Sequence, residues 1–159
     1  MSDFEKDLAE WFSDVKKAVI VGIGNPLRHD DIVGLEVVRR LKEKTSENVL
    51  LIESESVPEN YVESIAEFRP SHILIVDAAL LGLKSGSVRL TESSEVYGVA
   101  ISTHVLPIQI FCSYLKKSTD AKVGMLLIQP ENVDFGEGLS PKLRKTADRV
   151  VDVLLKILS

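Results

Sequence analysis

Apolar residues along the chain fall into two patterns, continuous runs and regularly spaced stripes. The continuous runs, rich in Val, Ile and Leu, lie at 18–24, 48–54, 72–78 and 122–129. Runs of this length and composition predict strands that are buried on both faces. Stripes with apolar residues three or four positions apart lie at 32–41, 61–68, 104–117 and 141–158. Their spacing predicts amphipathic helices that alternate with the strands.

Two further segments predict elements at the margins of this pattern. Residues 1–16 predict an N-terminal amphipathic helix that packs on the body of the domain. Phe4, Phe12 and Val15 belong to its apolar stripe and are separated by Asp, Glu and Lys. Segment 85–91, SGSVRLT, alternates in polarity and follows a glycine turn without an intervening helix. This arrangement favours a short antiparallel strand at one edge of the sheet.

The alternation of strands and helices predicts the fold class. We expect a three-layer α/β/α domain with a mostly parallel, five-stranded twisted sheet and one antiparallel edge strand. The last helix is expected to begin with Ser140 as its N-cap and Pro141 as its first residue. Because no repeat, low-complexity tract or linker interrupts the pattern, residues 1–159 predict a single domain.

Composition and charge exclude several classes of partner. The chain has 19 Lys and Arg against 24 Asp and Glu, a formal net charge of −5, which is unsuited to general nucleic-acid binding. No apolar run reaches the roughly 18 residues of a membrane span, and the first residues are acidic. We therefore expect a cytoplasmic protein without membrane insertion. The single cysteine, Cys112, predicts a core residue and excludes both an internal disulfide and a Cys-x-x-Cys zinc site.

Acidic residues are predicted to gather where the winding of the sheet reverses. Asp31 follows the first strand, Asp77 closes the third, and His104 begins a predicted helix. Ligands of doubly wound sheets bind beyond the carboxyl ends of strands at this reversal. Two carboxylates and one imidazole form a ligand set suited to Ni, Zn or Fe with open coordination positions.

Each candidate also has a structural interpretation. Asp30 or Asp31 could cap the next helix, and His104 could do the same or face solvent. Asp77 ends a buried strand, where a carboxylate is costly unless it is paired or bound. His29 and Asp30 are secondary candidates for handling a proton. His72 is expected at the amino end of its strand, away from this site.

A nucleotide site is a weaker alternative. Gly22 and Gly24 begin like a dinucleotide fingerprint, but Leu27 stands where the third glycine is needed. Glu53 ends the second strand as a ribose-binding acid would, although it follows Gly22 by 31 positions instead of about 20. The sequence has no Gly-x-Ser-x-Gly or His-Glu-x-x-His motif, so any hydrolysis would depend on carboxylates, a metal or both.

Several blocks resemble the hydrogenase maturation proteases in order and spacing. They are GIGNPLRHDDIVG at 22–34, SVPEN at 56–60, RPSHILIVDAALLGLKSGSVRL at 69–90, STHVLPI at 102–108 and LIQP at 127–130. Within this family, the blocks are most similar to the branch that serves formate-hydrogenlyase and related energy-converting [NiFe] hydrogenases. The resemblance implies an endopeptidase that removes a short C-terminal extension from the hydrogenase large-subunit precursor after nickel insertion. Cleavage would let the new C-terminus fold in.

The resemblance also implies roles for particular residues. Asp31, Asp77 and His104 match the family's metal-contacting positions, so the nickel would be supplied by the substrate precursor and would serve as a recognition handle. Other divalent ions such as Zn or Cd could occupy the site in the free protein, which we expect to be a monomer. The attacking group is either a metal-polarised water or a water activated by a carboxylate, as in an aspartyl-protease-like mechanism.

One segment departs from the family pattern, and two other functions remain open. Residues 53–56 read Glu-Ser-Glu-Ser where many relatives carry Asp-Gly-Gly. This difference bears on the shape of the edge that follows the second strand and on substrate preference. The same three ligands would also suit a non-catalytic, nickel-checking chaperone. A nucleotide-binding domain is the third possibility.

Overall fold

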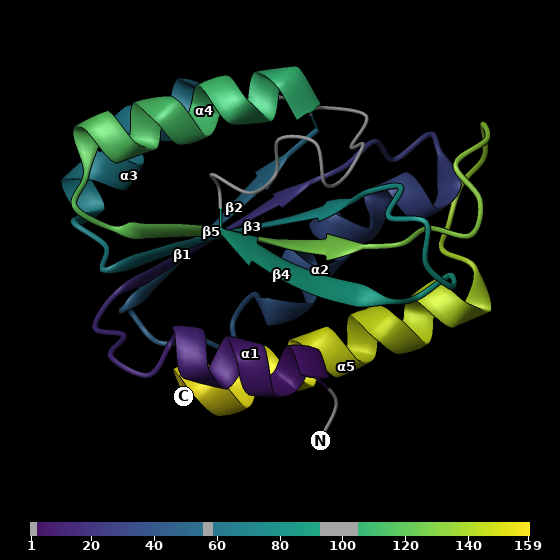
Figure 1. The fold of residues 1–159 in the computed structure, drawn as a ribbon, viewed down its shortest axis with the longest axis horizontal. Coiled ribbons are helices and arrows are strands. Elements are labelled where there is room, and N and C mark those ends of the chain that lie inside the picture. Colours follow the sequence, from purple (N-terminus) through teal and green to yellow (C-terminus); the bar gives the residue numbers. More distant parts are fainter. Residues whose placement is uncertain (1–2, 56–58, 93–104) are drawn as a thin grey trace.

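The chain folds around one five-stranded sheet (Figure 1). The computed structural model describes residues 3–55, 59–92 and 105–159. The sheet order is β2-β1-β3-β5-β4. The strands are β1 (Ala18–Ile23), β2 (Val49–Ser54), β3 (His72–Ala78), β4 (Val88–Glu92) and β5 (Lys122–Ile128). All neighbours pair in parallel except β4, which is antiparallel to β5, so the predicted topology with an antiparallel edge strand is confirmed.

Helices cover both faces of the sheet and form the outer two of three layers (Figure 1). One face carries α1 (Asp3–Trp11), α2 (Val33–Leu41) and α5 (Pro141–Leu158). The other carries α3 (Val62–Phe68) and α4 (Val105–Ser118). Short 3-10 turns, η1 (His29–Ile32) and η2 (Glu59–Tyr61), precede α2 and α3. No helix among the described residues is long and apolar enough to cross a membrane.

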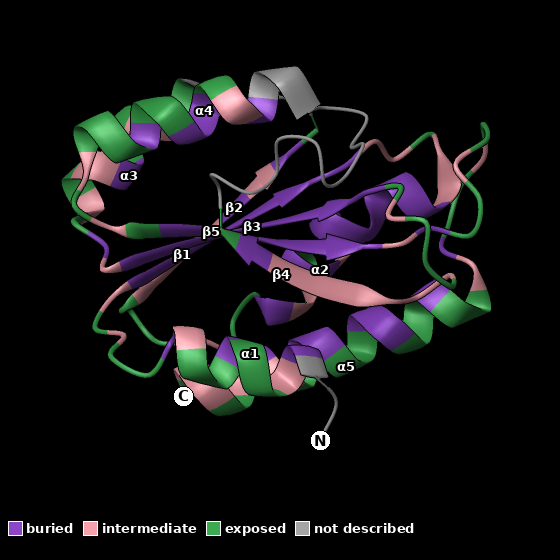
Figure 2. Cartoon of the chain, viewed as in Figure 1, coloured by how far each residue is buried: buried purple, intermediate pink, exposed green. Residues whose placement is uncertain are grey.

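The hydrophobic core forms two layers, one on each face of the sheet. Every residue of β1 and β3 is buried, as expected for central parallel strands (Figure 2). Alternate residues point to opposite faces, so Ile20 and Leu74 pack under α1, α2 and α5, whereas Val21 and Ile75 pack under α3 and α4. The continuous apolar runs in the sequence therefore correspond to strands covered on both sides.

Two predicted elements are shorter in the structure than in the sequence pattern. The first helix ends at Trp11 instead of reaching residue 16, because Val15 N–H bonds back to Phe12 and the chain turns toward the sheet. The edge strand begins at Val88, since Gly86 and Ser87 belong to a turn in which the Ser87 N–H donates to Lys84. Gly86 has a φ of +87° there.

Candidate functional site

Asp31 and Asp77 lie at the same edge of the sheet, where the winding reverses between β1 and β3. Gly22 pairs with Val76 in the parallel ladder, so β1 and β3 end side by side. Asp77 is the next residue of β3, and Asp31 lies in η1, which packs against β3. Both carboxylate residues are buried, with 2% and 0% of their surface exposed. The structure therefore places both acids at the edge of the sheet that the sequence predicts, on elements that pack together.

Backbone contacts set the approach of η1 and α2 to the sheet. A Cβ atom on Gly34 would collide with the carbonyl oxygens of Ile23 and Val76. A Cβ atom on Gly22 would collide with the carbonyl oxygen of Gly34. The close packing of helix on strand that a dinucleotide fingerprint obtains from its third glycine occurs here at Gly34, whereas Leu27, in the fingerprint position, is 57% exposed.

The pleat of β3 directs Asp77 toward the face that α3 and α4 cover. Ile73 and Ile75, which share its parity, pack in that layer. One carboxylate oxygen of Asp77 accepts a hydrogen bond from the Ala78 N–H at 2.9 Å. His104, the third predicted ligand, lies outside the described residues, and α4 begins at the residue after it. Among the described residues alone, no three His, Cys, Asp or Glu side chains are grouped as a metal site.

Asp30 braces two loops that are far apart in sequence. Its carboxylate accepts hydrogen bonds from the N–H groups of Glu131, Asn132 and Ser140 at 2.7–3.0 Å, and from the Ser140 hydroxyl at 3.0 Å. The side chain is completely buried. Asp30 therefore does not cap the next helix. Its role in handling a proton stays a prediction. Its partners are more than 100 positions away, so no local pattern could have revealed them.

The loop before η1 and the loop after β5 are joined along their length. His29 N–H donates to Gly136 O at 2.9 Å, and Gly136 N–H donates to Leu27 O at 2.9 Å. Arg28 Nε donates to Val133 O at 2.9 Å. A side chain at Gly136, whose φ is +152°, would collide with the His29 ring. His29 is therefore part of the packing between these loops, and its Nδ1 lies 3.1 Å from the carbonyl oxygen of Gly138.

Ser140 shows how this brace replaces an ordinary helix cap. It precedes Pro141 at the start of α5, as the sequence predicts, but its hydroxyl makes no capping bond to the helix. That hydroxyl donates to Asp30 instead. The start of α5 is thus tied to the loop that leads into η1.

His72 lies at the opposite, amino edge of the sheet, as predicted. Its Nε2 lies 3.0 Å from Trp11 O and 3.2 Å from an Asp14 carboxylate oxygen, and its Nδ1 lies 2.9 Å from the Ser71 hydroxyl. Burial lowers the pKa of His72, and the Asp14 charge partly opposes that shift. The residue fixes the chain after α1 to the start of β3.

Two other candidates have structural roles. Cys112 packs in the layer under α4, and burial raises the pKa of its thiol to about 11, which confirms a core residue. Glu53 accepts hydrogen bonds from Lys42 and, at 2.6 Å, from Arg39 Nε. The Lys42 hydrogen bond is the largest cause of the lowered pKa of Glu53. The Glu53 carboxylate is thus engaged by the end of α2.

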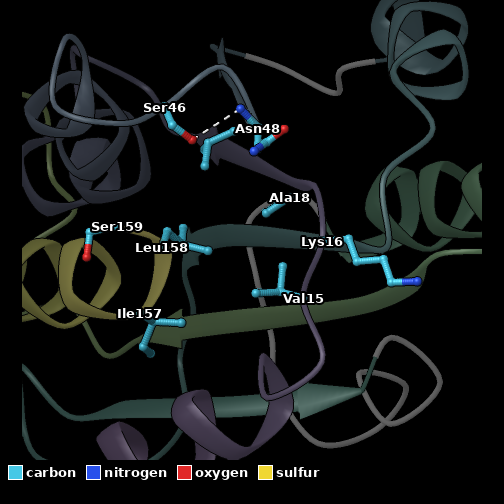
Figure 3. A pocket seen from close by; sticks show the side chains of 9 residues that line it. Val15, Lys16, Ala18, Ser46, Asn48, Ile157, Leu158 and Ser159 are labelled. Atoms are coloured by element: carbon cyan, nitrogen blue, oxygen red, sulfur yellow. Dashed lines mark hydrogen bonds between the residues drawn. The ribbon is translucent and has the colours of Figure 1, made fainter.

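A cavity of about 270 Å³ lies far from these acids, at the amino edge (Figure 3). It is lined by the segment before β1, by Asn48 and Val49 at the start of β2, and by the end of α5. Lys16 is the charged side chain among them. In a parallel sheet this is the edge opposite to the usual ligand site, and neither Asp31 nor Asp77 contributes to it.

Comparison with known proteins agrees with this architecture. A profile of the HycI hydrogenase maturation proteases matches residues 35–157. A protein of Methanocaldococcus jannaschii that is named as a hydrogenase maturation protease is 36% identical over 159 residues. The match covers 95% of this chain and 94% of that protein. The hydrogenase 3 maturation protease of Escherichia coli is 29% identical over 133 residues, covering 83% of this chain and 85% of its own.

Solved structures show the same relationship in three dimensions. The crystal structure of the [NiFe] hydrogenase maturation protease HycI from Thermococcus kodakarensis superposes with a TM-score of 0.87 and 36% identity, covering 96% of this chain and 98% of that one. The solution structure of the Escherichia coli endopeptidase HycI gives a TM-score of 0.75 and 26% identity, over 86% and 88% of the two chains. The chain belongs to the hydrogenase maturation protease family, and it is accordingly a peptide-bond hydrolase.

Proposed function

We propose that this protein removes a short C-terminal extension from a [NiFe] hydrogenase large-subunit precursor after nickel has been inserted. The observation that carries the proposal is the burial of Asp31 and Asp77 at one edge of the sheet, on a turn and a strand that pack together. The names of the related proteases support the substrate class, since one acts in the maturation of hydrogenase 3 and another in that of a [NiFe] hydrogenase.

In this proposal Asp31, Asp77 and His104 engage the nickel that the precursor carries. Carboxylate oxygens and an imidazole nitrogen suit Ni²⁺, and three such ligands leave positions for groups of the substrate. Binding the metal would fix the precursor so that the scissile peptide bond lies beside the two acids. Because three protein ligands form an incomplete shell, the free protein should hold Ni, Zn or Cd only weakly.

The acids can also supply the hydrolytic chemistry. A carboxylate placed beside a water molecule can take its proton as the oxygen attacks the peptide carbonyl, and the proton then passes to the leaving amine. A water polarised by the nickel of the precursor would serve as the same nucleophile. Either route fits an endopeptidase, and Cys112, buried with a raised pKa, is unsuited to attack as a thiolate.

The deciding experiment compares nickel-loaded and nickel-free precursor as substrates and measures the mass of the products. The wild-type protein should cleave the nickel-loaded form and leave the nickel-free form intact. Asp77→Asn, Asp31→Asn and His104→Ala should each lower kcat/KM by about a hundredfold or more, because they remove a charge or a ligand at the reacting centre.

Asp120→Asn provides the matched control, since Asp120 is exposed before β5 at the amino edge. It should cleave like the wild type, and circular dichroism should show that all four variants are folded. Normal cleavage by Asp77→Asn would overturn the proposed site. Nickel-dependent binding of precursor without any cleavage by the wild type would instead assign a chaperone role.

A further inference from the structure

Large apolar side chains are exposed around the edge that carries Asp31 and Asp77. They are Leu27, 57% exposed, Leu80, 51%, Leu83, 40%, and Phe135, 85%. We call these four residues the apolar rim. They lie in the loops that follow β1, β3 and β5, and these loops emerge at the same end of the sheet (Figure 1). Exposed apolar side chains gathered at one place mark interaction surfaces in soluble proteins.

The loop that carries Phe135 is held in place on both sides of that residue. Asn132 bonds to the Asp30 carboxylate through its N–H and accepts the Asp30 N–H at 2.9 Å through its carbonyl oxygen. Gly136 bonds to Leu27 and to His29. Phe135, the most exposed aromatic side chain of the described residues, therefore lies on a loop whose backbone is fixed to the loop that carries Leu27. Because the backbone around Phe135 is already ordered, little backbone freedom would be lost on binding a partner, which favours Phe135 as an anchor of an interface.

The loop that carries Leu80 and Leu83 is fixed in a similar way. Gln129, at the end of β5, accepts the Leu81 N–H at 2.6 Å through its side chain and the Gly86 N–H at 2.8 Å through its backbone. The loop with Leu80 and Leu83 and the loop with Leu27 are thus both hydrogen-bonded to the segment that follows β5. The exposed side chains therefore lie on loops whose backbone is ordered.

Part of the apolar rim lies in the same loops as the candidate acids. Leu27 precedes Asp31 by four residues in one loop, and Leu80 follows Asp77 by three. A substrate segment that reaches the two acids would approach along the loops that carry these side chains. Their occupant is therefore the substrate, and its contacting surface must itself be apolar.

We propose that the apolar rim docks the open face of the hydrogenase large-subunit precursor, with Phe135 as its main anchor; this inference rests on the proposed function. Before cleavage the C-terminal segment of the precursor has not folded in, so the apolar surface that it later covers is accessible. After cleavage the new C-terminus would cover that surface. The apolar rim therefore distinguishes precursor from product and favours release of the mature subunit.

The test separates docking from chemistry. Phe135→Ala should raise KM for nickel-loaded precursor about tenfold or more and leave kcat unchanged, the pattern expected when binding common to ground and transition states is lost. Leu27→Ala should give a smaller rise, and Phe135→Leu should restore most of the affinity. Tyr114→Ala is the matched control, because Tyr114 is 49% exposed on the outer face of α4.

Direct binding of precursor and mature subunit to the wild type and to Phe135→Ala completes the design. The wild type should prefer the precursor, and the variant should lose most of that preference. Equal KM values for Phe135→Ala and Tyr114→Ala would overturn the docking surface while leaving the proposed cleavage intact. A wild-type dimer that Phe135→Ala dissociates would assign the apolar rim to self-association and also overturn it. Wild-type binding that depends on Phe135 but yields no cleavage would support docking and contradict the proposed function.

Discussion

Both edges of the sheet bury ionisable side chains, but the carboxyl edge also exposes large apolar ones. At the amino edge His72 is buried with hydrogen-bonding partners on both ring nitrogens, and the Trp11 ring packs edge-on against it at a centroid distance of 5.0 Å. At the carboxyl edge three carboxylate residues are buried, while Leu27 and Phe135 are exposed. Ordinary folding buries apolar groups and solvates charges. The carboxyl edge departs from that rule, and such departures occur at functional sites.

The largest effect on stability is expected from breaking the brace at the carboxyl edge. Asp30→Asn should lower the free energy of unfolding by about 3 kcal/mol, because every partner of the carboxylate is a donor and the new amide NH₂ would face one of them. Urea denaturation measures this loss. Hydrogen exchange should also accelerate at the backbone amides of 131–140.

Asp134→Asn is the control, since Asp134 is exposed in the same loop. It should change the free energy of unfolding by less than about 0.5 kcal/mol. Equal stability of the two variants would mean that the Asp30 carboxylate contributes nothing to joining the loops, and that the contrast between the two edges is smaller than the geometry indicates.

A smaller and pH-dependent effect is expected at the amino edge. Burial lowers the pKa of His72, so below its ordinary value of 6.5 the unfolded chain takes up a proton more readily than the folded one. Stability is therefore complete above about pH 6.5 and falls as the pH decreases toward the lower pKa of the folded state. Asp14 and Lys122 are the charged groups that act on the ring.

Denaturation of the wild type and of His72→Gln at pH 7.5 and 5.5 tests this expectation. The variant is less stable at both values but should lose less stability between them, since its amide does not titrate. An identical loss in the two proteins would assign the acid sensitivity to other groups.

The smallest effect is expected where charges are paired near the surface. Glu53→Gln should lower the free energy of unfolding by less than about 1 kcal/mol, because its partners Arg39 and Lys42 are 42% and 54% exposed and the ion pairs are screened by solvent. The KM for precursor should not change. Glu55→Gln is the control, and a raised KM in Glu53→Gln alone would extend the substrate-binding surface to the end of β2.

Periodicity in the sequence was sufficient to predict the sheet. The apolar runs that became β1 and β3 are continuous because both faces are covered, and the alternating run before Glu92 became the antiparallel edge strand. Asp31 and Asp77 could be assigned to one edge because parallel strands end together. These inferences depend only on local pattern and on the rules of strand connection.

Features that depend on distant contacts could not be predicted in the same way. Asp30 and Asp31 are chemically identical neighbours, and only the position of the 131–140 segment makes Asp30 the brace. The path of the chain between α1 and β1 likewise depends on the Ser71 hydroxyl, which accepts a hydrogen bond from the Lys16 N–H, 55 positions away in the sequence. The role of His104 as a ligand stays a prediction.

The contact between Gly34 and the carbonyl oxygens of Ile23 and Val76 limits how this protein can change over time. Elsewhere in the core, side chains act as spacers, so exchanging one aliphatic residue for a larger one shifts a helix relative to the sheet. No spacer stands between the start of α2 and the sheet. A side chain at Gly22, Gly24 or Gly34 would therefore displace the turn that carries Asp31 relative to the strand that carries Asp77.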